Sequence, residues 1–181
     1  MEIKFKDLKV LFTREEIETR IKELANELNK KYNGEEVYAI CVLKGAVMFA
    51  VDLIKYINCP LKIEFIRLSS YLGGTNTTGK VNAVDISLPD LNGKNVLIIE
   101  DIVDTGLTAK FLTDFIKLNF KTKSTTFCSL LDKKITRKIY IEPDFYGFEI
   151  DDKFVVGYGL DYDGYYRNLD YIAYVPNNNA Q

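Results

Sequence analysis

Two uninterrupted hydrophobic segments constrain the fold of this chain most. Val37–Leu43 contains only hydrophobic residues, and Asn95–Ile99 is hydrophobic after its first residue. A strand of this kind must be covered on both faces, which is typical of parallel sheets packed between helices. A capping-box pattern at Thr13 and Glu16 begins an amphipathic helix that extends to Tyr32. Alternation of such strands and helices predicts an α/β fold, with a mostly parallel central sheet flanked by helices.

The same patterns predict the other elements. A helix is expected over 46–57, and a second follows the acidic pair at 100–101, with a face made by Phe111, Leu112, Phe115 and Ile116. Further strands are expected over 61–68, 84–88, 124–131, 145–149, 154–157 and 171–175. Since the last third is rich in strands, we expect it to form a subsidiary β-rich lobe. No linker or repeat divides the chain, so residues 1–181 are expected to be one domain.

The chain contains no histidine among its 181 residues. This absence excludes Ser-His-Asp and Cys-His catalysis, zinc bound by histidine and a histidine pH switch. Proton transfer must therefore use carboxylates, lysines, tyrosines or a cysteine. Cys41, Cys59 and Cys128 are widely spaced among apolar neighbours, which favours small buried thiols in a reducing compartment over nucleophiles or disulfides.

The charge pattern limits the classes of partner. The formal net charge is −2, from 24 basic and 26 acidic residues, which argues against a broad nucleic-acid-binding surface. Residues 1–7 mix both charge signs and lack the apolar core of a signal peptide. No apolar run approaches the roughly 20 residues that span a bilayer. We therefore expect a cytoplasmic protein that binds neither nucleic acid nor membrane.

The segment 96–108 reads VLIIEDIVDTGLT and carries the chemistry. It predicts a buried strand that ends in Glu100 and Asp101, at the edge of the sheet where α/β proteins bind ligands. The loop 104–108 offers backbone N–H groups, two hydroxyls and a glycine, which suit a phosphate. The two carboxylates suit sugar hydroxyls or Mg²⁺. The alternative is an acidic strand end with Asp104 as a simple helix N-cap. This alternative is disfavoured, because two adjacent carboxylates at a buried strand end need a compensating ligand.

This segment resembles the phosphoribosyl-pyrophosphate signature of type I phosphoribosyltransferases. With the surrounding motifs, residues 10–175 resemble the bacterial hypoxanthine-guanine phosphoribosyltransferases. The resemblance implies the type I phosphoribosyltransferase fold, with a small hood lobe formed by the N-terminal segment and the C-terminal third. It also implies a Mg²⁺-dependent enzyme of purine salvage. Such an enzyme transfers the 5-phosphoribosyl group of phosphoribosyl pyrophosphate to N9 of a 6-oxopurine, hypoxanthine or guanine, giving IMP or GMP and pyrophosphate. It also implies a homodimer or homotetramer, with which the 12 Tyr and 11 Phe are compatible.

The resemblance also assigns roles to the residues of the motif. Asp104 is expected to act as general base or acid toward N7 of the purine. Glu100 and Asp101, together with Asp161, are expected to hold Mg²⁺. The residues expected to bind phosphoribosyl pyrophosphate, with its 5′-phosphate in the loop, are Glu100, Asp101, Asp104, Thr105, Gly106, Leu107 and Thr108.

Two cationic positions match the pyrophosphate-binding residues of the family. Lys44 and Gly45 follow a predicted strand and match its pyrophosphate loop, in which the Leu-Lys peptide bond is often cis. Arg167 matches its pyrophosphate-contacting arginine, whose fork pairs well with phosphate oxygens.

The purine is expected to contact four residues that match the family. Lys133 would donate to the 6-oxo group, Phe154 would stack on the ring, and the backbone of Val155 would read its edge. Asp161 would approach the purine 2-position. The neighbouring cations are interpreted as surface residues, namely Lys134, Arg137 and Lys138.

A polar segment, 69–80, contains three glycines and no apolar period. In the family the matching loop, which Ser70 and Tyr71 open here, closes over the reacting centre. Exclusion of water would protect a cationic sugar from hydrolysis. On its residues alone, the segment is equally an ordinary surface loop.

Three other functions compete with this one. The first is a phosphoribosyltransferase that prefers xanthine, because the pocket residues do not distinguish the use of xanthine from that of hypoxanthine or guanine. A non-catalytic regulator that senses phosphoribosyl pyrophosphate and binds nucleic acid would need a concentrated basic face and damaged catalytic motifs, and the sequence has neither. An acidic metal-dependent phosphatase would leave the Gly-Leu-Thr half of the motif unexplained.

Overall fold

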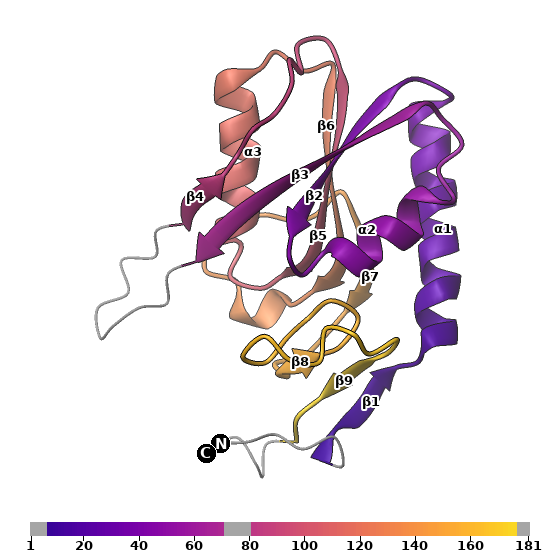
Figure 1. Cartoon of the computed structure of the whole chain (residues 1–181), viewed down its shortest axis with the longest axis vertical. Helices are drawn as coiled ribbons and strands as arrows, with labels where there is room; N and C mark the ends of the chain where they lie inside the picture. The colour runs from indigo at the N-terminus through magenta and orange to yellow at the C-terminus, as the bar shows by residue number, and fades with distance from the viewer. Residues whose placement is uncertain (1–6, 71–80, 177–181) are drawn as a thin grey trace.

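The computed structural model describes residues 7–70 and 81–176. Its central sheet has six strands in the order β4-β3-β2-β5-β6-β7 (Figure 1). The strands are β2 (Val37–Leu43), β3 (Leu61–Ser70), β4 (Val81–Asp85), β5 (Asn95–Val103), β6 (Ser124–Asp132) and β7 (Phe145–Glu149). All neighbouring pairs are parallel except β3 with β4. The predicted α/β fold with a mostly parallel sheet is confirmed.

Helices cover both faces of this sheet. The helices α1 (Arg14–Tyr32) and α2 (Val47–Ile54) pack on one face, and α3 (Leu107–Asn119) packs on the other (Figure 1). The two central strands, β2 and β5, are therefore buried along nearly their whole length. Their continuous hydrophobic sequence follows directly from this two-sided cover.

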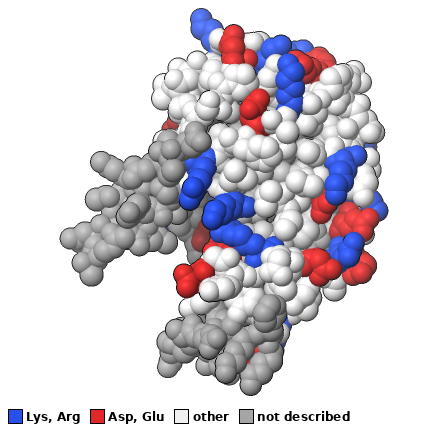
Figure 2. Space-filling view, in the orientation of Figure 1, with Lys and Arg blue, Asp and Glu red and all other residues white. Residues whose placement is uncertain are grey.

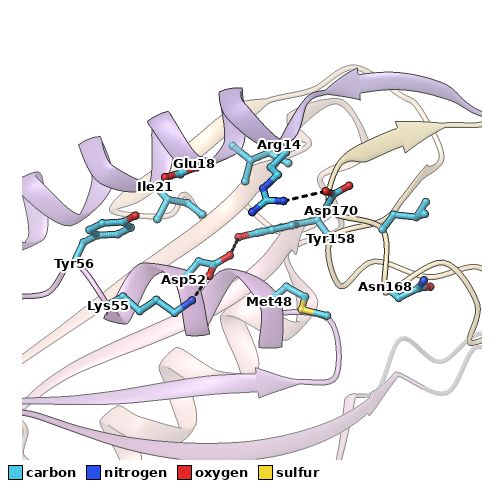
Figure 3. A pocket seen from close by; sticks show the side chains of 12 residues that line it. Arg14, Glu18, Ile21, Met48, Asp52, Lys55, Tyr56, Tyr158, Asn168 and Asp170 are labelled. Carbon is cyan, nitrogen blue, oxygen red and sulfur yellow. Dashed lines mark hydrogen bonds and ion pairs between the residues drawn. The ribbon is translucent and has the colours of Figure 1, made fainter.

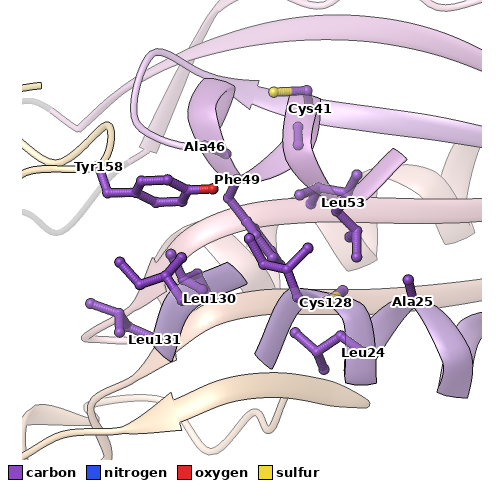
Figure 4. Packing of buried hydrophobic residues seen from close by; sticks show 14 of the residues in the cluster. Leu24, Ala25, Cys41, Ala46, Phe49, Leu53, Cys128, Leu130, Leu131 and Tyr158 are labelled. Atoms are coloured by element: carbon purple, nitrogen blue, oxygen red, sulfur yellow. The ribbon is translucent and has the colours of Figure 1, made fainter. Parts of the chain in front are cut away.

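The helix α1 begins and ends as its sequence predicts. Thr13 and Glu16 form the reciprocal capping box, and Asn33 ends the helix in the left-handed conformation. Its apolar stripe meets Phe49 and Leu53 of α2 over the buried thiols Cys41 and Cys128 (Figure 4). Cys59 is only partly buried, in contrast to the prediction.

On the opposite face, α3 uses the predicted residues. Leu112 and Ile116 are buried in the second core cluster, and Phe111 and Phe115 pack against its edge. The chain crosses from β5 to α3 within four residues, so the helix begins at the carboxyl end of the central strand. This short crossing places the N-terminus of α3 beside the acidic strand end.

A second, antiparallel sheet forms the hood. It joins β1 (Lys9–Phe12) from the N-terminal segment to β9 (Ile172–Tyr174) and β8 (Val155–Val156) from the last third of the chain. The hood lies beyond the carboxyl ends of the parallel strands (Figure 1). Ligands of parallel α/β sheets bind at this end, so the hood covers the candidate site.

Several predicted boundaries are wrong. The strand β5 does not stop at the acidic pair but continues to Val103, because it keeps pairing with β6 as far as Val103 and Asp132. Similarly, β3 extends to Ser70 and β4 begins at Val81, because the two pair antiparallel. The predicted helix 46–57 ends at 54 and finishes in tight turns, and the predicted strands 154–157 and 171–175 are shorter.

The hood is tied to the helices by polar contacts around a cavity of about 430 Å³ (Figure 3). The Tyr158 hydroxyl donates to Asp52 Oδ2 at 2.6 Å, and Lys55 lies 2.7 Å from the other oxygen of that carboxylate. The Arg14 guanidinium lies 3.5 Å from the carboxylate of Asp170. The charged groups of this cavity therefore serve to anchor the segment 158–170 to α1 and α2.

We predict that Tyr158→Phe destabilises the fold by about 1–2 kcal/mol, because the variant loses a hydrogen bond to a carboxylate. Urea unfolding measures this directly. Tyr174→Phe, which changes a second tyrosine of the hood, is the matched control. Equal stability of Tyr158→Phe and the unmodified protein would show that the contact does not anchor the hood.

Candidate active site

The acidic end of β5 is the centre of the site. Glu100 is 8% exposed, and its Oε2 has no hydrogen-bond partner among the described residues. Burial raises the pKa of Glu100 well above its ordinary value, and the charge of Asp101 adds to this. A buried carboxylate oxygen without a partner is unfavourable in the free protein, so this position suits a ligand that supplies positive charge or hydroxyl donors.

Asp101 is packed against the loop that follows β2. Its Oδ1 accepts from the Ile102 amide at 3.0 Å. Burial raises the pKa of Asp101 also, although the Ile102 amide and the charge of Arg167 oppose that shift. A Cβ atom added to Gly45 would lie 1.7 Å from Asp101 Oδ2, so only glycine lets the loop approach the carboxylate.

The same loop also contacts the hood. A Cβ atom at Gly159 would lie 2.0 Å from the Gly45 carbonyl oxygen, so three segments of backbone meet at this point. Lys44 is exposed beside it, and the Leu43–Lys44 peptide bond is cis. The predicted pyrophosphate loop and acidic strand end are therefore in direct contact.

The loop 104–108 connects β5 to α3. Gly106 precedes the helix with φ of 83°, and a Cβ atom there would lie 2.7 Å from the Ile139 carbonyl oxygen. The Thr105 carbonyl accepts from the amides of Lys138 and Ile139. Contacts with the chain after β6 thus fix this loop. It leads directly into the N-terminus of α3, where the first N–H groups of a helix have no partner within the helix and suit a phosphate.

Asp104 is held from two directions. The Thr136 hydroxyl donates to Asp104 Oδ1, and Arg137 Nε donates to the Asp104 carbonyl at 3.1 Å. The candidate general base therefore has a fixed backbone and a fixed carboxylate. Both contacts come from the turn after β6, in which the sequence identified only Lys133 as part of the site.

Arg137 is not the surface cation that the sequence suggested. Its side chain is 10% exposed, and its guanidinium donates to the carbonyls of Val103 and Ile141 and to the carboxylate of Asp132. Composition does not distinguish it from its lysine neighbours. One sequence feature could have identified it, namely that Arg137 follows Asp132, a carboxylate at the end of a buried strand, by five residues.

Two predicted purine-binding residues occupy unusual environments. Lys133 is 8% exposed, and its Nζ lies 2.7 Å from Asp152 Oδ1, so it too is not an ordinary surface lysine. Phe154 is 49% exposed, with its ring edge-on to Tyr162 at 5.7 Å. An aromatic ring with this exposure next to the buried Val155 is available to stack on a planar ligand.

Arg167 and Asp161 form a pair in the hood. The Arg167 Nη2 lies 2.6 Å from Asp161 Oδ1, and Nη1 donates to the Gly159 carbonyl at 2.5 Å. Since Gly159 touches Gly45, this arginine lies beside the predicted pyrophosphate loop. Asp161 also accepts from the Gly164 amide, so in this structure its carboxylate organises the hood.

The remaining predicted residues fall at the margin. Ser70 ends β3, whereas Tyr71 and the rest of the predicted loop lie outside the described residues. Lys and Arg side chains gather at the level where the parallel strands end, above the hood (Figure 2). Such a local concentration of positive charge favours an anionic ligand.

The described residues contain no group of three or more His, Cys, Asp or Glu side chains able to hold a metal ion by themselves. Two neighbouring carboxylates with an unpartnered oxygen instead suit Mg²⁺, which usually keeps waters and shares oxygens with a phosphorylated substrate. None of the described helices has the length and apolarity needed to cross a membrane.

An acidic strand end, a phosphate-type loop and a covering hood together define an enzyme of the phosphoribosyltransferase class. The phosphoribosyl transferase domain family matches residues 9–163. The hypoxanthine-guanine phosphoribosyltransferase of Bacillus subtilis is 46% identical over 165 residues, 91% of each chain, and that of Staphylococcus aureus is 47% identical over 168 residues, 92% of this chain and 93% of the relative.

The structure agrees with these sequence matches. A crystal structure of a hypoxanthine phosphoribosyltransferase from Staphylococcus aureus has a TM-score of 0.88 at 45% identity, covering 94% of this chain and 92% of that one. The chain therefore belongs to the hypoxanthine-guanine phosphoribosyltransferase family. The predicted family, fold and enzyme class are confirmed.

We predict that Glu100→Gln stabilises the ligand-free protein near neutral pH. The folded-state pKa of Glu100 is raised, so its contribution to stability is present at low pH and is lost as the pH rises through that pKa. The gain from glutamine should therefore appear at about pH 7.5 and vanish at about pH 4, below the ordinary glutamate pKa. Urea unfolding at both pH values, with Glu142→Gln as an exposed control, measures it. A loss of stability at pH 7.5 would contradict the assignment.

We also predict that Arg137→Met costs about 3–5 kcal/mol of unfolding free energy, because it leaves the buried Asp132 carboxylate without its hydrogen-bonded cation and with only Lys134 at 3.9 Å. Lys138→Met, at the next and exposed position, should change stability by less than about 0.5 kcal/mol. Chemical denaturation compares the two. Similar small effects for both variants would mean that Arg137 behaves as a surface residue.

Proposed function

We propose that this enzyme transfers the 5-phosphoribosyl group of phosphoribosyl pyrophosphate to N9 of hypoxanthine or guanine, with release of pyrophosphate. One observation carries this proposal. Near the end of β5, the buried Glu100 and the partly buried Asp101 lie shortly before the phosphate-type loop, and Asp101 is packed against Gly45. Sugar hydroxyls, pyrophosphate and 5′-phosphate are three neighbouring parts of one substrate, and each has a suitable group at this point.

The residues divide the work as follows. The N–H groups of the loop, with Thr105 to Thr108, hold the 5′-phosphate. Lys44 and Arg167 neutralise the pyrophosphate as it leaves, so that positive charge can develop on the sugar. Asp104 takes the N7 proton while N9 attacks the anomeric carbon. Since little covalent chemistry is left to the protein, positioning and charge account for most of the rate.

Base selection is assigned to the turn after β6 and to the hood. Lys133, which is also paired with Asp152, donates a further N–H to the 6-oxo group, which adenine lacks. Its low exposure leaves little water to accept that N–H when the wrong base binds. Phe154 stacks on the ring, and the Val155 backbone and Asp161 face the opposite edge of the base. The relative use of guanine, hypoxanthine and xanthine depends on the edge of the base that faces the Val155 backbone and Asp161.

Glu100 and Asp101 are proposed to hold Mg²⁺ together with substrate oxygens, and Asp161 to contact a second ion. The bound ion supplies charge neutralisation for the pyrophosphate. Support comes from the unpartnered Glu100 oxygen and from the fact that a carboxylate pair completes magnesium coordination only with substrate or water oxygens.

Three further features complete the proposal. The whole chain, 1–181, acts as one phosphoribosyltransferase domain that assembles as a homodimer or homotetramer. It binds neither nucleic acid nor membrane and acts in the cytoplasm, where its three free thiols would stay reduced. By resemblance, the segment opened by Ser70 and Tyr71 has the part of the family's closing loop, and from Tyr71 to residue 80 it lies outside the described residues.

The proposal is tested by an absorbance or radiolabel assay with phosphoribosyl pyrophosphate, Mg²⁺ and each of four bases, namely hypoxanthine, guanine, xanthine and adenine. Hypoxanthine and guanine should be converted, and adenine should not. Asp104→Asn should lower kcat by about 10²–10⁴-fold with little change in KM, because it removes the base and not the binding groups. Activity of that variant within threefold of the unmodified enzyme, at equal thermal stability, would overturn the role of Asp104.

A further inference from the structure

The turn that follows β6 connects the base-reading lysine to the general base. It begins at Lys133, whose amide donates to the Val103 carbonyl at 3.0 Å. A short 3₁₀ helix, η2 (Lys134–Thr136), follows, and the Arg137 amide closes it by donating to the Lys134 carbonyl. Since Arg137 Nε also donates to the Asp104 carbonyl at 3.1 Å, the turn is fixed at both ends against the segment that carries Asp104.

Thr136 is the only residue of this turn that contacts the Asp104 carboxylate within the described parts of the chain. Its hydroxyl has two acceptors in reach, namely Asp104 Oδ1 and the Lys133 carbonyl at 3.2 Å. A hydroxyl carries one proton, and an ionised carboxylate is the stronger acceptor. The proton is therefore donated to Asp104, which fixes the orientation of that side chain.

The second oxygen of the carboxylate is left for the substrate. Within residues 7–70 and 81–176, no group hydrogen-bonds to Asp104 Oδ2. A general base must present one oxygen within hydrogen-bond reach of the proton that it accepts. A carboxylate anchored through one oxygen presents the other in a fixed direction, whereas a free one would rotate about its last bond.

We propose that Thr136 is a positioning residue for the transfer reaction: its hydroxyl holds the Asp104 carboxylate in the orientation needed at N7, on the same rigid turn that carries Lys133. This inference rests on the proposed role of Asp104. It assigns a function to a position that the sequence treats as an ordinary part of a charged turn. Through this turn, the residue that recognises the 6-oxo group and the residue that moves the proton keep one relative position.

The test uses Thr136→Val, which removes the hydroxyl at nearly constant volume, and Thr136→Ser, which retains it. Thr136→Val should lower kcat by about tenfold or more with KM values for both substrates within about twofold, because only proton transfer is affected. Thr136→Ser should stay within about threefold of the unmodified enzyme. Ile135→Ala, at the neighbouring position that is 70% exposed, is the matched control and should leave kcat unchanged.

A double-mutant cycle separates this inference from the function on which it rests. If Thr136 acts through Asp104, Thr136→Val should cost about tenfold alone and less than about twofold in the Asp104→Asn background. An equal loss in both backgrounds, or a loss of melting temperature with no loss of kcat, would overturn the role of Thr136. If Asp104→Asn itself kept full turnover, the proposed base would fail first, and the two failures are therefore distinguishable.

Discussion

The structure depends on two ionisable side chains held at the buried end of its central strand. Glu100 and Asp101 continue the hydrogen bonding of β5 and are covered by helices and hood, where burial raises the pKa of both. A fold gains no stability from carboxylates in such a place. Their position is explained by a bound ligand that compensates the buried carboxylates. The surrounding segments form the site for that ligand.

Two neighbouring segments approach the pair through glycine backbone, and side chains hold the others in place. Gly45 admits the loop after β2 to the carboxylate of Asp101, and Gly159 lets the hood reach that loop in turn. Arg137 ties the end of β5 to the turn after β6 and thereby fixes the phosphate loop. The hood, with Arg167, is anchored to α1 and α2 around the cavity of Figure 3. Backbone contacts suit a site in which small displacements reduce the rate.

The sequence predicted most of the fold because its hydrophobic strands and the capping box of α1 are local signals. The sequence did not predict where a strand ends when pairing with another strand sets that end. For example, β5 continues through two charged residues because it pairs with β6. Within the site, the motif 100–108 was visible as a pattern, whereas in the turn after β6 only Lys133 was identified. Arg137 and Thr136 acquire their roles only when the chain folds back on Asp104, and no spacing rule reports that contact.

The central claim is that Glu100 and Asp101 bind a substrate together with Mg²⁺. Calorimetric titration with phosphoribosyl pyrophosphate, with and without Mg²⁺, tests it most directly on the unmodified enzyme and on the variant carrying both Glu100→Gln and Asp101→Asn. We expect Mg²⁺ to raise the affinity of the unmodified enzyme by roughly tenfold or more, and to have little effect on the variant. An equal magnesium-dependent gain in both proteins would contradict the account.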